Sequence, residues 1–188
     1  MTSPSQGSTG PTAAEFALAS EIVSLEHHVA AGGWDAPIRV FALVRTADAL
    51  VETPSLAGEI PPEAVRLAKE DPHALLAIEQ EGLPQAPNLE TLLASLAWPE
   101  TVHGVAIAVE QFVVPPEAEA GLPEDSEARV QALLEHPERD DVRIVAGVLR
   151  SGEAWCALRY RSHDADDKVA QSSDAVPGLI EGLRSTLE

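Results

Sequence analysis

The hydrophobic positions near the start of the chain repeat with the period of a helix. Between residues 13 and 31 they recur in steps of three and four, as in an amphipathic helix. These positions are Phe16, Leu18, Ile22, Val23, Leu25 and Val29. The pair Gly32-Gly33 predicts the end of this helix, because glycine readily terminates helices. Residues 1–12 are rich in Ser, Thr, Gly and Pro without apolar periodicity. We therefore expect a disordered tail, followed by a single domain over 13–188.

Apolar runs later in the chain predict strands. The predicted strands are 38–45, 102–114, 142–150 and 153–161, the last two forming a hairpin. Ser151-Gly152 is a favourable two-residue turn for that hairpin. Between 46 and 53 we expect a turn and a returning strand, which Pro54 ends. The stretch 73–79 fits either a helix or a short strand, since periodicity does not separate the two over so few residues.

Helix signals fall between these strands. The predicted helices are 62–69, 89–97, 130–134 and 179–187. Pro61-Pro62 suits a helix start, because proline is tolerated in the first turn, and Asn88 is a good N-cap. The resulting order of elements predicts an α+β fold. We expect a mainly antiparallel sheet of four to six strands, with helices packed on one face.

The charge of the chain restricts the kind of partner. Lys and Arg number 12 against 31 Asp and Glu, so the net charge is -19. Such a chain repels phosphate, so we expect no nucleic-acid partner and no docking on an anionic membrane. No apolar run approaches the roughly 20 residues of a membrane-spanning helix, and the N-terminus does not resemble a secretory signal. A single cysteine, Cys156, suits a reducing compartment, so we expect a soluble cytoplasmic protein.

Much of the charge lies in one connection. Residues 115–141 carry nine acidic residues and two arginines. One interpretation is a solvated insertion that keeps the sheet edge soluble, and the other is a segment that docks on a partner. The sequence leaves these two open. For the net charge of the whole chain, a salt-adapted protein is a further interpretation, because acidic, lysine-poor surfaces occur in such proteins without any partner.

Two arginines at the end of the predicted hairpin form the main candidate site. With a two-residue turn, Arg159 and Arg161 share a sheet face with Ile144 and Ala146. Guanidinium groups beside an apolar surface bind carboxylates through paired hydrogen bonds. The same groups can instead form structural ion pairs with Asp164 or with the acidic connection, and both interpretations stay open.

His163 follows these arginines and opens a loop that contains Asp164, Asp166 and Asp167. The loop offers imidazole and carboxylate ligands, but it lacks the glycine and the terminal glutamate of a calcium-binding loop. We therefore expect no metal, and we take His163 and the two arginines as the candidate binding residues.

Nothing else in the sequence indicates catalysis. Cys156 falls on the predicted core face of its strand, where a thiol is an inert small hydrophobe. His27 and His28 are neighbours on a helix and point about 100° apart, so they do not chelate one ion well. Phosphate-binding loops, dinucleotide fingerprints and nucleophile elbows are absent from the sequence. We expect no cofactor and no catalytic residues.

Several phrases of the sequence resemble a known family. They are AWPETVHGVAIAVEQFVVPP at 97–116, VRIVAGVLRSGEAWCALRYRSHDAD at 142–166 and VPGLIEGLRSTL at 176–187. IRVFALVRTADAL and EQEGLP are similar too, so the resemblance covers about residues 15–188. The family is that of the PPA-1309-like proteins, conserved in actinobacteria. The resemblance implies a cytoplasmic bacterial protein, and it implies no activity, cofactor or catalytic residue.

These observations support two functions of different kinds. We expect a non-enzymatic protein-binding or chaperone-like module for a partner with a basic surface, with an exposed apolar floor around Ile144, Ala146 and Ala157. The alternative is a small-molecule-binding or enzymatic domain that uses the Arg159, Arg161 and His163 cluster in a cleft. A further interpretation is a stable domain whose site the sequence does not reveal. The oligomeric state stays open.

Overall fold

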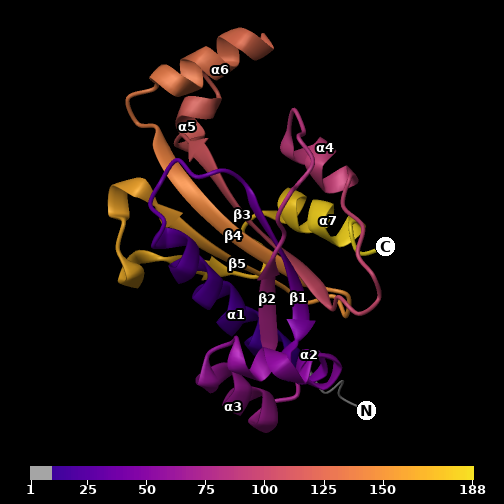
Figure 1. The fold of residues 1–188 in the computed structure, drawn as a ribbon. Helices are drawn as coiled ribbons and strands as arrows, with labels where there is room; N and C mark the ends of the chain where they lie inside the picture. Colours follow the sequence, from indigo (N-terminus) through magenta and orange to yellow (C-terminus); the bar gives the residue numbers. More distant parts are fainter. Residues whose placement is uncertain (1–9) are drawn as a thin grey trace, which may run out of the picture.

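The computed structural model describes residues 10–188, whose strands form one six-stranded antiparallel sheet (Figure 1). The strand order is β2-β1-β3-β4-β5-β6. The strands are β1 (Arg39–Arg45), β2 (Leu75–Glu79), β3 (Gly104–Val113), β4 (Asp140–Leu149), β5 (Ala154–Tyr160) and β6 (Ala170–Ser172). The α+β class and the antiparallel sheet are as the sequence predicts. The expected tail over 1–12 lies mostly outside the described residues, while Thr12 caps the first helix.

Seven α-helices and three short 3-10 segments of the described residues surround this sheet. The α-helices are α1 (Ala13–Ala30), α2 (Thr46–Glu52), α3 (Pro62–Glu70), α4 (Leu89–Ala94), α5 (Pro116–Glu119), α6 (Ser126–Glu135) and α7 (Pro177–Ser185). The 3-10 segments are η1 (Pro54–Gly58), η2 (Arg161–His163) and η3 (Asp166–Lys168). Asn88 caps α4 as expected and accepts a hydrogen bond from the Thr91 amide at 2.8 Å. The ambiguous stretch 73–79 contains strand β2.

Helices cover both faces of the sheet, and the expectation of helices on one face is wrong in this respect. On one face α1 buries Leu18, Ile22 and Leu25 against the sheet. On the other face α7 packs Ile180 and Leu183 there, beside α4 (Figure 1). The reason is visible in β4, where every residue from 142 to 149 is buried, so that both sets of alternating side chains need cover.

Residues 46–52 of the segment 46–53 form helix α2, and the expected turn with a returning strand is wrong. The edge of β1 that such a strand would occupy is taken by β2, with Leu43 opposite Ala77. Thr46 then starts α2 by donating both its amide and its hydroxyl to the Ala74 carbonyl, at 2.9 and 3.2 Å. The local sequence TADALVE contains good helix formers, so local propensity and strand pairing agree on a helix.

The hairpin of β4 and β5 turns through three residues, and the two-residue turn is wrong. Leu149 donates its amide to the Glu153 carbonyl at 2.9 Å, and Gly152 between them has φ of 112°. Arg159 therefore lies opposite Arg143, on the face of α1, and not beside Ile144 and Ala146. A shift of one residue in register exchanges the two faces of a strand.

Candidate functional site

Arg159, near the end of β5, lies among three carboxylates. Its Nε donates to Glu26 Oε1 at 2.6 Å, and a terminal nitrogen donates to Glu26 Oε2 at 2.9 Å. Asp164 and Asp166 accept from the terminal nitrogens at 3.1 and 2.7 Å. Glu26 is completely buried on α1, so the ion pair joins this helix to the sheet.

The groups in this cluster stabilise one another's charge. Hydrogen bonding to Glu26 raises the pKa of the Arg159 guanidinium further above its usual range. The indole N–H of Trp34, and then Arg159, hold the pKa of Asp164 below its ordinary value. Arg159 does the same for the pKa of Asp166. Arg159 and both aspartates therefore stay charged at neutral pH.

The other two predicted site residues lie at the margin of this cluster. Arg161 donates from one terminal nitrogen to Asp35 and to Asp141, at 3.1 Å in each case. Its guanidinium also lies 5.5 Å from the ring centre of Trp34. The Nδ1 of His163 lies 2.7 Å from the neighbouring Ser162 hydroxyl, and the side chain is exposed.

These contacts correspond to the structural ion pairing that the sequence left open. An anionic ligand at Arg159 or Arg161 has to displace carboxylates that are already in place. The network also holds Arg143, whose guanidinium contacts Glu110 at 2.9 Å and lies 4.3 Å from the Trp34 ring centre. The network of ion pairs as a whole joins α1, the segment around Trp34 and the end of the sheet.

Cys156 and His103 are two further residues whose side-chain types often take part in catalysis. Burial raises the pKa of the Cys156 thiol to about 11, which makes it a poor nucleophile at neutral pH. His103 has both ring nitrogens in use, because Nδ1 accepts from the Arg45 amide at 3.2 Å and Nε2 lies 3.3 Å from Asp48. Within residues 10–188, no three His, Cys, Asp or Glu side chains form a group that could hold a metal ion.

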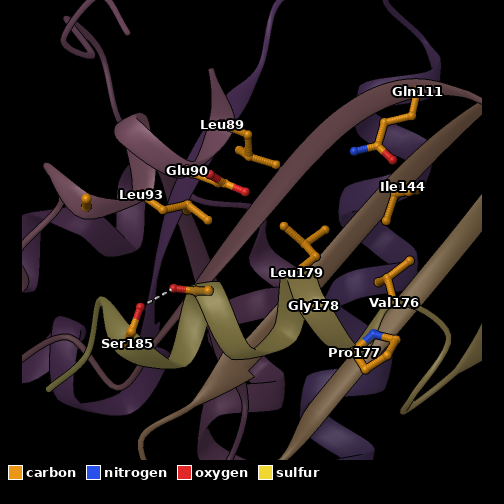
Figure 2. A pocket seen from close by; sticks show the side chains of 12 residues that line it. Leu89, Glu90, Leu93, Gln111, Ile144, Val176, Pro177, Gly178, Leu179 and Ser185 are labelled. Atoms are coloured by element: carbon orange, nitrogen blue, oxygen red, sulfur yellow. Dashed lines mark hydrogen bonds between the residues drawn. The ribbon is translucent and has the colours of Figure 1, made fainter. Parts of the chain in front are cut away.

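A pocket of about 530 Å³ opens between α4 and α7, on the face of the sheet opposite α1 (Figure 2). Leu93, Ile144 and Leu179 contribute apolar walls. Glu90 and Gln111 line it as well, and Figure 2 shows them on opposite sides with Leu179 between them. The sequence does not predict that these two side chains share a cavity. Each belongs to a separate pattern, the helix motif of 89–97 and the strand pattern of 102–114.

A second candidate is the projection between β3 and β4, which we call the acidic arm (residues 112–141). Figure 1 shows α5 and α6 at the end of the molecule opposite α2 and α3. Within α6, which the structure describes completely, no residue is buried. The arm carries four of the eight exposed large hydrophobic side chains in the described part of the chain, namely Phe112, Val113, Val130 and Leu134.

The apolar floor expected on the sheet is not exposed. Ala146 and Ala157 have no exposed surface, and Ile144 is 3% exposed. Ala157 lies on the α1 face and the other two lie on the α7 face, so they do not form one surface. These three residues therefore do not form a binding surface. The spacing of Val130 and Leu134 in an acidic segment is the sequence signal that points to the arm.

The fold defines an α+β protein built on a six-stranded antiparallel sheet with helices packed against it. The family of PPA1309-like proteins matches residues 18–188, so the chain belongs to that family, as its sequence phrases indicate. No curated protein matches the chain, and no solved structure does. Among the helices of the described residues, none has the length and apolar character needed to cross a membrane.

Proposed function

We propose that this chain is a non-enzymatic, cytoplasmic protein-binding module, and that its acidic arm binds a basic, partly apolar surface of another protein. One observation carries the proposal: α6 projects from the fold with apolar side chains that the chain itself leaves uncovered. Val130 is 48% and Leu134 43% exposed. An exposed apolar patch with a polar rim is typical of an interaction surface.

Three of the four exposed apolar residues of the arm are connected through the helix α6 and Arg139. Val130 and Leu134 are one helical turn apart on α6 and face the same way. Arg139 connects them to Phe112, since its guanidinium donates to the Leu134 carbonyl at 3.1 Å and lies 5.7 Å from the centre of the Phe112 ring. The patch therefore spans a helix and the strand from which the arm emerges.

The charge around this patch selects the partner. Nine acidic residues and two arginines lie between 115 and 141, and Arg139 is paired with Asp141 at 3.2 Å. Such a surface accelerates encounter with a basic partner and repels an acidic one. An amphipathic segment with lysine or arginine beside leucine-like side chains matches both properties. The Arg159, Arg161 and His163 cluster is less suited to an anionic ligand, because carboxylates already pair with both guanidinium groups.

The test uses a defined partner. A fluorescently labelled amphipathic helical peptide of about 18 Lys and Leu residues is titrated with the protein and followed by anisotropy. We expect binding that weakens several-fold when salt rises from about 50 to about 300 mM. Val130→Ser with Leu134→Ser should weaken it about tenfold or more, since burying a Val or Leu side chain contributes roughly 1.5–3 kcal/mol.

The matched control is Val51→Ser with Leu67→Ser, which removes an exposed Val and an exposed Leu from α2 and α3. It should bind the peptide as the parent does, and a peptide with Glu in place of Lys should not bind. Equal losses in the arm variant and the control variant, or no loss in the arm variant, would contradict the proposal.

A further inference from the structure

We propose that the pocket between α4 and α7 is a binding site for a small organic cation with an apolar body, such as an arylalkylamine. The site is separate from the acidic arm, and the inference does not depend on the function proposed there. Its volume of about 530 Å³ lies in the range of pockets that enclose small molecules.

The walls of the pocket determine the body of the ligand. Ile144 on β4 and Leu93 on α4 are nearly completely buried at its base. Leu179 and Val176, from α7 and the residue before it, are half-buried at its sides. An aromatic ring or alkyl chain placed here removes apolar surface from water on both partners, which is the main source of affinity in such sites.

Two polar side chains determine the head of the ligand. Glu90 is the single charged residue among the described residues that line the pocket, and Gln111 lies across from it (Figure 2). No hydrogen bond to another residue drawn in Figure 2 holds either side chain, whereas Ser185 donates to the Gly182 carbonyl at 2.7 Å. A carboxylate beside apolar walls pairs with an ammonium group, and it disfavours a carboxylate or phosphate ligand.

The two helices form the pocket because they diverge along α7. At Gly182 they touch, since a Cβ there would lie 2.9 Å from Leu93 Cδ1. Gly178 lies four residues earlier and faces the same way on the helix, yet a Cβ built there meets nothing within 4 Å. Glycine at 178 thus leaves open the space that a larger side chain would enter.

This geometry supplies a test by isothermal titration calorimetry. The probes are 4-phenylbutylamine, 4-phenylbutanol and 4-phenylbutyrate, which share one apolar body and differ in the head group. We expect the amine to bind at submillimolar concentration and about tenfold more tightly than the carboxylate, with the alcohol in between. Glu90→Gln should reduce the affinity for the amine to that for the alcohol.

Gly178→Leu should abolish binding of all three probes, and Gly178→Ala, which adds a single methyl group, should largely retain it. Neither change should lower the melting temperature, because Ala and Leu are better helix formers than Gly. The arm variant Val130→Ser with Leu134→Ser should bind the amine as the parent does. Equal affinity for the three probes, no binding of the amine at millimolar concentration, or unchanged binding by Gly178→Leu would each overturn the proposal.

Discussion

Arg159 and Glu26 form an ion pair that is almost completely removed from water. Arg159 is 3% exposed and Glu26 has no exposed surface. Two charges buried in this way lose their hydration, and their attraction for each other compensates for that loss. Removing either partner alone therefore destabilises the fold. Asp164 and Asp166 also contact the guanidinium, but both are exposed and remain solvated without it.

We predict that Arg159→Met destabilises the protein by about 3–5 kcal/mol, because it leaves the Glu26 carboxylate buried without its cation. Replacing both partners, in Glu26→Leu with Arg159→Met, should recover more than half of this loss. Urea unfolding of the three proteins gives the free energies. A loss below about 1 kcal/mol for Arg159→Met would show that the pair is not a structural element.

Glu21 is a second residue whose surroundings govern its charge. It faces the edge strand β2, where its Oε1 accepts a hydrogen bond from the Ala77 amide at 3.0 Å. Burial raises the pKa of this carboxyl from 4.5 to about 7, and the hydrogen bond only partly opposes the effect. The folded state therefore binds the Glu21 proton more tightly than the unfolded state does.

From this pKa we predict a pH-dependent difference between the parent and Glu21→Gln. The stabilisation from protonated Glu21 is fully present below pH 4.5 and is lost as the pH rises through about 7. Glutamine stays neutral and keeps an acceptor for the Ala77 amide. The free energy of unfolding of the variant, relative to that of the parent, should therefore rise by about 1–3 kcal/mol from roughly pH 5 to 8. Urea unfolding at each pH measures this difference. A constant difference across this range would contradict the raised pKa.

At the scale of elements, the position of α1 depends on a missing side chain. Gly147 in β4 lies beneath α1, and a Cβ there would lie 2.5 Å from Ile22 Cδ1. Ile22 has no exposed surface, so it has no free space into which it can move. The close contact between helix and strand thus requires glycine at this position.

We predict that Gly147→Ala destabilises the protein by about 1–3 kcal/mol through overpacking. Ile22→Val removes the Cδ1 atom. In urea unfolding, the double variant Gly147→Ala with Ile22→Val should therefore lose less free energy of unfolding than the two single variants lose in sum. Gly104→Ala is the control, because its Cβ would lie 2.4 Å from the Val148 carbonyl oxygen, which Ile22→Val does not displace. Strict additivity at Gly147 would contradict the packing described.

The same elements show what the sequence could predict. The helical nature of α1 follows from its apolar period and its end follows from Gly32-Gly33, both of which act locally. The face on which Arg159 lies did not follow from the sequence. It depends on whether the turn has two or three residues, and the three-residue turn has Gly152 at a positive φ. The helix α2 was missed because the partner that occupies the edge of β1 lies some 30 residues further along the chain.

The candidate sites were predictable to different degrees. The charge of the acidic arm and the spacing of Val130 and Leu134 can be read from the sequence, whereas their exposure depends on how far α6 stands from the sheet. The pocket was not predictable, because Glu90 and Gln111 come to line one cavity only through the packing of α4 and α7 on the sheet. Long-range packing of this kind leaves no local signal.

At the scale of the whole molecule, helices on both faces cover the central part of the sheet. The features that remain accessible are the acidic arm at one end of the molecule (Figure 1) and the pocket between α4 and α7. The two are suited to different chemistry, since the arm presents charge and exposed apolar side chains while the pocket encloses a small volume.

The most direct test of the protein-binding function maps the peptide on the protein. In amide ¹H–¹⁵N spectra recorded during titration with the Lys and Leu peptide, we predict shifts concentrated in residues 112–141, with α6 affected most. Residues of α4 and α7 should stay unchanged. Shifts that concentrate around the pocket, or that spread evenly over the molecule without the arm, would contradict the assignment of protein binding to the acidic arm.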